Sequence, residues 1–218
     1  VAPPLSSGDS CGCMGASIGV AHGVTRAGIA ERAVAVIGDS TFFHSAIPAL
    51  ITAVHHRSDI TMVLLDNSGT GMTGFQPHPG LTTDALGSDA PAIDPVEVCR
   101  AIGARVEIAD PFDIEATQQT LLDLLQDDKG VKVLVLRQIC ALSPEKKGKK
   151  LYEMTLDQEV CVGENCGCNR LCTRVFRCPG LVWDLEKKAA KLDEVICTGC
   201  GVCASICPSG AIQRKEGA

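Results

Sequence analysis

Four cysteines near the end of the chain follow the spacing C-x2-C-x2-C-x3-C, with a proline directly behind the last, in CTGCGVCASICPSGAI (197–212). This spacing is typical of chains that bind two [4Fe–4S] clusters, in which three thiolates of a run hold one cluster and the fourth holds its neighbour. Zinc sites usually contain two separated C-x2-C pairs, so the arrangement favours iron over zinc. The chain is therefore expected to end in a small electron-transfer module.

A second, irregular cysteine run precedes the terminal one, in CVGENCGCNRLCTRVFRCPG (161–180). It ends in Cys178-Pro179, as the terminal run ends in Cys207-Pro208, and each final cysteine is expected to bind the other run's cluster. The expected ligands of one cluster are Cys178, Cys197, Cys200 and Cys203. The expected ligands of the other are Cys207 and three of Cys161, Cys166, Cys168 and Cys172. Either Cys166 or Cys168 is the spare cysteine, and the sequence leaves that choice open.

The number and placement of the cysteines favour a reducing compartment. Nine of the thirteen lie in residues 161–218, and an odd total without an export signal is typical of thiols that bind metal. The N-terminus lacks the charged and apolar regions of a signal peptide, and no apolar run of about eighteen residues could span a membrane. We expect a cytoplasmic protein, and the missing initiator Met suggests a piece of a longer polypeptide.

Composition argues against a nucleic-acid partner. Aromatic residues make up 3% of the chain, which leaves few platforms for stacking bases, and the net charge of −6 does not attract a phosphate backbone. Hydrophobic residues make up 45%, which is enough for a packed core.

The first two thirds of the chain alternate between helical segments and apolar strands. Strands are predicted at 32–38, 59–67, near 104–109 and at 131–139, and helices at 11–29, 42–56, 94–102 and 113–127. Continuous hydrophobic strands that alternate with helices are typical of a parallel α/β sheet. The polar segment SPEKKGKK (143–150) begins a linker. We expect an α/β domain at 1–142, a linker at 143–156 and a two-cluster, ferredoxin-like domain at 157–218.

Polar residues follow two of the predicted strands. Gly38 opens GDSTFFH (38–44), where the backbone can approach a ligand and a helix N-terminus favours an anionic phosphate. Asp39 would repel phosphate directly and is suited to hold a divalent cation that bridges to it. Asn67 ends another strand and can face the same crevice, ahead of the Gly-rich stretch NSGTGMTGFQPHPG (67–80). The two strand ends together predict a site for Mg2+ and a diphosphate; the alternative for Asp39 is a simple helix cap.

Residues 38–80 resemble the thiamine-diphosphate motif GDG…N of thiamine-dependent enzymes, with Ser40 in place of the third motif residue. The same segment is similar to the α subunits of the indolepyruvate:ferredoxin oxidoreductases, within the 2-oxoacid:ferredoxin oxidoreductase family. VAPPLSSGDSCGCMGASIG (1–19) and the terminal cysteine module share this resemblance, which covers nearly the whole chain. The family's α subunit is much longer, so its N-terminal domains and the glutamate that activates the aminopyrimidine are expected outside this stretch.

The resemblance implies roles for individual residues. Mg2+ would be bound by the side chains of Asp39 and Asn67 and by the carbonyl of Gly69. Gly38, Ser40 and Thr41 would approach the diphosphate, and Thr70 and Met72 would line the loop. Cys13, Met14 and Gly15 would lie near the cofactor rings. His44 and His78 are candidates for proton transfer or for binding the substrate carboxylate, and the alternative for each is a structural hydrogen bond.

The resemblance also implies a reaction, the oxidative decarboxylation of an arylpyruvate such as indolepyruvate to aryl-acetyl-CoA and CO2. Thiamine diphosphate and Mg2+ would serve this step, and two [4Fe–4S] clusters would pass the electrons to ferredoxin. A β subunit is implied as partner, in a hetero-oligomer. The alternatives are a non-oxidative thiamine-dependent decarboxylase and an electron-transfer subunit without its own catalytic site.

Overall fold

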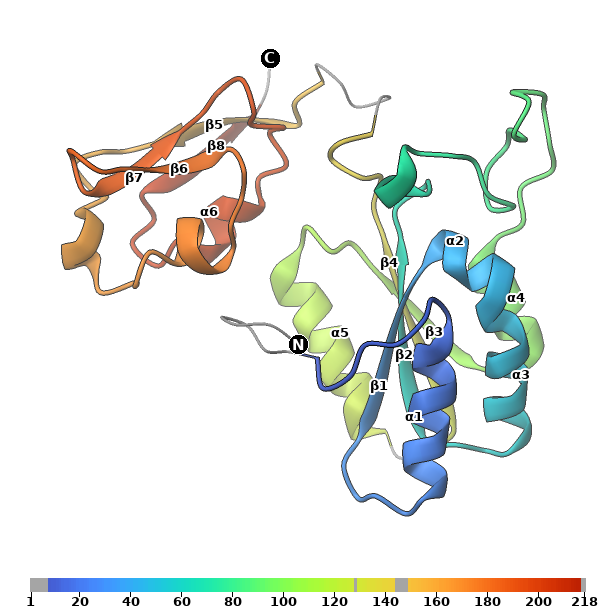
Figure 1. Cartoon of the computed structure of the whole chain (residues 1–218). Coiled ribbons are helices and arrows are strands. Elements are labelled where there is room, and N and C mark those ends of the chain that lie inside the picture. Colours follow the sequence, from blue (N-terminus) through green and yellow to red (C-terminus); the bar gives the residue numbers. More distant parts are fainter. Residues whose placement is uncertain (1–7, 128, 144–148, 217–218) are drawn as a thin grey trace. The chain divides into compact units, whose positions relative to one another are not determined.

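The computed structural model describes residues 8–127, 129–143 and 149–216 (Figure 1). The chain divides into two compact units, a larger one at Ser10–Ser143 and a smaller one that includes residues 149–216. Residues 144–148 of the predicted linker lie outside the described residues. None of the described helices is both long and apolar enough to cross a membrane.

A four-stranded parallel sheet forms the centre of the larger unit. Its spatial order is β1 (Ala33–Gly38), β2 (Ile60–Asp66), β4 (Val131–Arg137) and β3 (Arg105–Ala109). All three pairings are parallel, which confirms the α/β fold predicted from the apolar runs. Gly38 is paired with Leu65, so the chain leaves β1 and β2 at the same edge of the sheet. The polar residues that follow both strands therefore lie at that edge.

Helices cover both faces of this sheet (Figure 1). On one face α1 (Ala16–Arg26), α3 (Ile47–His55) and α4 (Pro95–Ile102) enclose the main core, and α5 (Ile114–Gln126) lies on the other. The largest buried core side chains are Ile18, Phe42, Leu50, Ile60, Met62 and Leu64. Each apolar side chain of this size stabilises the fold by roughly 1.5–3 kcal/mol when it is fully buried. This packing holds the strand ends in fixed positions.

The helix after β1 begins earlier than the sequence predicts. It starts with the short α2 (Asp39–Thr41), continues through a π-helical turn at Phe42–Ala46 and runs on as α3. Gly38 has an extended backbone and stands at the N-cap position, so the helix starts at the first residue after the strand. Asp39 therefore lies in the first turn, next to free backbone N–H groups.

The smaller unit consists of two antiparallel strand pairs and short turns. β5 (Tyr152–Leu156) pairs with β8 (Ile212–Glu216), and β6 (Leu181–Asp184) pairs with β7 (Ala189–Leu192). The helical pieces are a 3-10 turn at Gly163–Cys166, a π-helical turn at Leu171–Val175 and α6 (Val202–Ile206).

Strand β5 corrects the predicted linker, which was drawn to residue 156. Met154 is buried in the small core with Leu181, Cys203 and Ile212, and Tyr152 and Leu156 pack against that core. The strand depends on pairing with β8, near the far end of the module. The lysine-rich composition ahead of it gives no sign of such a distant partner.

Candidate functional site

Asp39 lies at the carboxyl edge of the sheet, directly after β1, and only 3% of its surface is exposed. Its Oδ1 accepts a hydrogen bond from the backbone N–H of Ser40 at 2.7 Å. Its Oδ2 accepts from the backbone N–H of Asn67 at 3.0 Å and from that of Gly69 at 3.4 Å. One carboxylate thus joins the ends of β1 and β2, as predicted from the position of both residues after their strands.

His78 is the second ionisable group at Asp39. Its Nε2 lies 3.2 Å from Oδ2 of Asp39, without the alignment of a full hydrogen bond, and the residue is 9% exposed. Nδ1 accepts a hydrogen bond from the backbone N–H of Gly80 at 3.1 Å, which puts the proton of the neutral ring on Nε2. The ring stacks on Phe43 with 5.5 Å between centroids. His78 is therefore clamped with its N–H side toward the carboxylate.

These neighbours determine the charge of Asp39. Burial by itself raises the pKa of the carboxyl group, but the interaction with His78 and the backbone N–H groups of Ser40 and Gly69 outweigh it. The pKa of Asp39 consequently lies below its usual value of 3.8, so the carboxylate is ionised at neutral pH. A buried, ionised carboxylate at a strand end is the kind of oxygen ligand that a divalent cation prefers.

Asn67 supplies a second free oxygen at this edge. Its Oδ1 is buried and has no hydrogen-bond partner among the described residues, while its backbone carbonyl accepts from the N–H of Cys140 at 3.1 Å. A buried amide oxygen without a partner costs roughly 1–3 kcal/mol, unless a ligand satisfies it. The carbonyl of Gly69 accepts one bond, from the N–H of Gly71 at 2.8 Å, which leaves one of its lone pairs free. The donor set fits the predicted magnesium site.

The N-terminus of α1 approaches the same region. Gly15 has a φ of 87°, and a Cβ atom built on it would lie 2.9 Å from Cβ of Ser45, in the π-helical turn that follows α2. Cys13 accepts a hydrogen bond through its backbone carbonyl from Ala16, and the side chains of Cys13 and Met14 are exposed. The structure thus brings Gly15 close to the helix that Asp39 begins.

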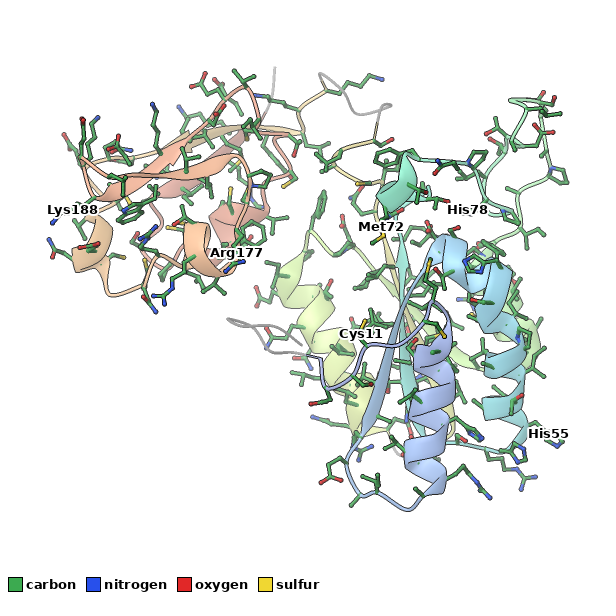
Figure 2. All side chains as sticks on the ribbon, viewed as in Figure 1. Cys11, His55, Met72, His78, Arg177 and Lys188 are labelled. Carbon is green, nitrogen blue, oxygen red and sulfur yellow. The ribbon has the colours of Figure 1, made fainter. Side chains whose placement is uncertain are left out.

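The other predicted cofactor contacts differ in their surroundings. A Cβ atom on Gly38 would meet no atom within 4 Å, so there is room beside the start of the helix. Thr41 is buried and Ser40 half-buried. Thr70 holds a small hairpin through a hydrogen bond from its N–H to the carbonyl of Gln76, and Met72, at its tip, is 96% exposed. Figure 2 labels Met72 and His78 on the segment that follows β2.

His44 and His78 have different environments, although both were predicted as candidates for the same role. His44 is exposed on the π-helical turn, and its side chain forms no hydrogen bond or ion pair with another residue in the described part of the chain. His78 is enclosed by Phe43, Gly80 and Asp39. The enclosing residues Phe43 and Gly80 were missed in the sequence, because only the tertiary fold brings residue 43 against residue 78.

In the smaller unit the structure gathers one set of thiols around the terminal run. These group A thiols are Cys178, Cys197, Cys200 and Cys203. Burial, followed by the charges of Cys178, Cys200 and Cys197, raises the pKa of the Cys203 thiol to about 12. Burial also raises the pKa of Cys178, with added effects from Cys200 and Cys197. A Cβ atom on Gly180 would lie 3.1 Å from Cα of Cys197, so the chain just after Cys178 touches the terminal run.

A second set of thiols lines a separate cavity of the same unit. These group B thiols are Cys161, Cys166, Cys168, Cys172 and Cys207, and the cavity has an empty volume of about 410 Å³ including its open mouth. Apolar side chains such as Leu156, Leu171 and Ile212 complete its wall. The last cysteine of each run thus lies with the other run, as the exchange of ligands between two clusters requires.

Among the described residues, no three His, Cys, Asp or Glu side chains converge as the ligands of a single metal ion do. A [4Fe–4S] cluster makes a different demand, because its four thiolates bind four separate irons around a cube. Thiols spread around a cavity with apolar walls fit that demand, and group B has one thiol more than a cluster takes.

Comparison with known proteins agrees with both halves of this description. The family described as "Thiamine pyrophosphate enzyme, C-terminal TPP binding domain" matches residues 4–136, more than half of the chain. The chain belongs to the thiamine pyrophosphate enzyme family. A second family, described as "4Fe-4S binding domain", matches residues 190–213, which include the terminal cysteine run.

Relatives of this thiamine pyrophosphate enzyme confirm the resemblance found in the sequence. The indolepyruvate oxidoreductase subunits IorA of Pyrococcus horikoshii and Thermococcus kodakarensis are 41% and 40% identical to it over its whole length. The chain spans 35% of the length of each of these relatives. The match to a solved 2-oxoglutarate:ferredoxin oxidoreductase from Magnetococcus marinus covers 58% of this chain and 46% of that protein's chain. The sequences are 19% identical, and the TM-score is 0.49.

Proposed function

We propose that this chain carries the thiamine-diphosphate site and the electron outlet of a 2-oxoacid:ferredoxin oxidoreductase. The proposed reaction converts a 2-oxo acid and coenzyme A to an acyl-CoA and CO2, and passes two electrons, one at a time, through two [4Fe–4S] clusters to ferredoxin. The observation that carries the proposal is the presence in one chain of a buried Asp39–Asn67 oxygen pair and two groups of thiols.

The oxygens at the sheet edge are assigned to Mg2+. Asp39 contributes an ionised carboxylate, Asn67 its buried Oδ1, and Gly69 a carbonyl lone pair. His78 holds Asp39 in place, since its ring is fixed by Phe43 and by the N–H of Gly80. We therefore assign His78 to positioning the metal ligand, and leave His44 as the exposed candidate for contact with substrate.

Other residues at this edge are assigned to the organic cofactor. Thiamine diphosphate, when bound, supplies a carbanion that attacks the ketone of the 2-oxo acid and allows loss of CO2. Gly38, at the N-cap with open space beside it, and Ser40 and Thr41, at the start of the helix, are assigned to its diphosphate. Thr70 and Met72, on the loop after β2, and Cys13, Met14 and Gly15, at the entry to α1, are assigned to further contacts with the same cofactor.

The thiols are assigned to two clusters. Group A supplies four ligands to the first cluster, and Cys207 with three other group B thiols supplies the second. Thiolates that bind iron must stay reduced, which agrees with a cytoplasmic location.

The substrate and partners are proposed from the relatives' names. Indolepyruvate oxidoreductase acts, by its name, on indolepyruvate, so an arylpyruvate is the proposed 2-oxo acid. A β subunit is the proposed partner in a hetero-oligomer, because the named relatives are subunits of an oxidoreductase. Ferredoxin is the proposed electron acceptor.

The proposal is tested by anaerobic reduction of the complete oxidoreductase with indolepyruvate and coenzyme A, followed by EPR. We expect reduced-cluster signals and aryl-acetyl-CoA as product. Asp39→Asn removes the ionised metal ligand, so we expect the reduction rate to fall about a hundredfold or more and Mg2+-dependent thiamine diphosphate binding to weaken in calorimetry. Dithionite should still reduce the clusters of this variant.

Asp89→Asn is the matched control, because Asp89 is an exposed aspartate with no side-chain hydrogen bond among those found in the described residues. It should bind cofactor and react like the parent protein. An aldehyde as the major product would instead indicate non-oxidative decarboxylation. Full activity in Asp39→Asn would leave only an electron-transfer role for this chain.

A further inference from the structure

Arg170 lines the cavity that the group B thiols surround. Among the described residues that line it, Arg170 is the only basic side chain, and the thiols are the only groups there that can become anionic. The other lining side chains are neutral, and most of them are apolar. A positive charge in an apolar wall interacts more strongly with a group in the cavity than it would across water.

The guanidinium group of Arg170 is incompletely satisfied. Its Nε is buried and has no hydrogen-bond partner among the described residues. Its Cζ lies 4.2 Å from the ring centroid of Trp183, which also lines the cavity, so the plane of the group is held over an aromatic face. A buried donor without an acceptor is costly, and a stacked guanidinium has little freedom to turn toward solvent. An acceptor bound in the cavity that Arg170 lines could satisfy this donor.

The backbone at Arg170 is also unusual. Its φ is 60° and that of Asn169 is 51°, so two successive residues other than glycine adopt the left-handed conformation. Asparagine tolerates this conformation, but an arginine there costs roughly 1–2 kcal/mol. Glycine at this position would remove that cost.

We propose that Arg170 directs its charge and its Nε–H toward the [4Fe–4S] cluster held by group B thiols, and thereby raises the reduction potential of that cluster. This inference rests on the proposed function, since it requires a cluster in the cavity. A cluster with four thiolates is anionic and becomes more negative when it takes up one electron. A nearby cation and a hydrogen bond to cluster sulfur both stabilise the reduced form. The reduction potential of the cluster beside Arg170 is then higher than it would be without this arginine.

The test is an EPR-monitored redox titration of the complete oxidoreductase, with dithionite and mediators in place of substrate. In Arg170→Gln we expect one of the two midpoint potentials to become more negative, by about tenfold in the reduction equilibrium constant, which is about 59 mV for one electron. The other midpoint potential should stay unchanged. Iron content per chain, measured on the same samples, reports whether both clusters are present.

Arg174→Gln is the matched control. Arg174 is exposed, lies on the adjacent π-helical turn, bonds to Asn169 Oδ1 at 2.9 Å and does not line the cavity. The Arg174→Gln substitution removes the same charge from the same module, and we expect no shift in either reduction potential. Trp183→Phe keeps the Arg170 charge while altering the packing around it, so a shift limited to Arg170→Gln separates charge from packing.

Two results would overturn the inference. One is an unchanged pair of potentials in Arg170→Gln with full iron content, and the other is an equal shift in Arg174→Gln. If Arg170→Gln loses iron, Arg170→Lys is measured instead. It keeps the charge and removes the Nε–H, so it must give a smaller shift in the same direction, and no shift contradicts the inference. A parent protein with iron in group A alone would instead refute the two-cluster part of the proposed function.

Discussion

Cysteine residues in this chain have sharply different chemical environments. Cys11 and Cys13 are exposed ahead of α1, whereas Cys99 in α4 is completely buried in the main core. Burial, with a smaller effect from the charge of Asp94, raises the pKa of the Cys99 thiol to about 12. Because the thiolate is the reactive form of cysteine, Cys99 behaves as a small apolar residue.

This difference predicts the outcome of thiol labelling. When the folded protein is treated with iodoacetamide at pH 8, Cys99 should stay unmodified while Cys11 and Cys13 are alkylated, as read by peptide mass spectrometry. In urea all three should react. Equal labelling of Cys99 and Cys13 in the folded protein would show that α4 does not bury this thiol.

At the Asp39 site the sequence was informative for some residues and silent for others. The proximity of Asp39 and Asn67 could be predicted, since the carboxyl ends of neighbouring parallel strands meet at one edge of the sheet. The contact of His78 with Asp39 could not be predicted, because it depends on a loop that returns to stack the His78 ring on Phe43. Arg170 was missed for a similar reason: a single arginine between two cysteines shows no pattern until the cavity is formed.

Secondary-structure elements follow the predicted ranges where hydrophobic periodicity is strong. The strands β1, β2, β3 and β4 lie within the four predicted ranges, and the central pair, β2 and β4, is buried along most of its length. The entry to α1 is less obvious. The small, apolar stretch 11–29 was expected to be one helix, yet the helix begins only at Ala16, after the left-handed Gly15.

Gly15 therefore offers a test of how α1 is anchored. In Gly15→Ala the alanine must keep a left-handed backbone, and its Cβ atom lies too close to Ser45. We therefore expect a loss of about 2 kcal/mol or more in unfolding free energy. Gly19→Ala is the control, because Gly19 is exposed within α1 and a Cβ there meets no atom within 4 Å. It should stabilise by about 0.5–1 kcal/mol in urea unfolding. Equal effects of both changes would contradict the close approach.

On the scale of the whole molecule, the two units differ in how they are stabilised. The larger unit has an extensive core of buried side chains between its sheet and three helices. The core cluster of the smaller unit, within the described residues, consists of Met154, Leu181, Cys203 and Ile212, with several thiols packed against it. Units this small rarely fold on a hydrophobic core alone, and bound metal commonly supplies the rest.

Removal of iron should therefore affect the units unequally. With the clusters bound, amides of the β6–β7 and β5–β8 pairs should be protected in hydrogen exchange followed by mass spectrometry. After anaerobic chelation of iron we expect this protection to be largely lost, because metal-binding free energy contributes directly to folding. Amides of β2 and β4 should keep their protection, since the core around them contains no cluster ligand. Persistent protection of both small strand pairs in the iron-free protein would show that the module folds without its clusters.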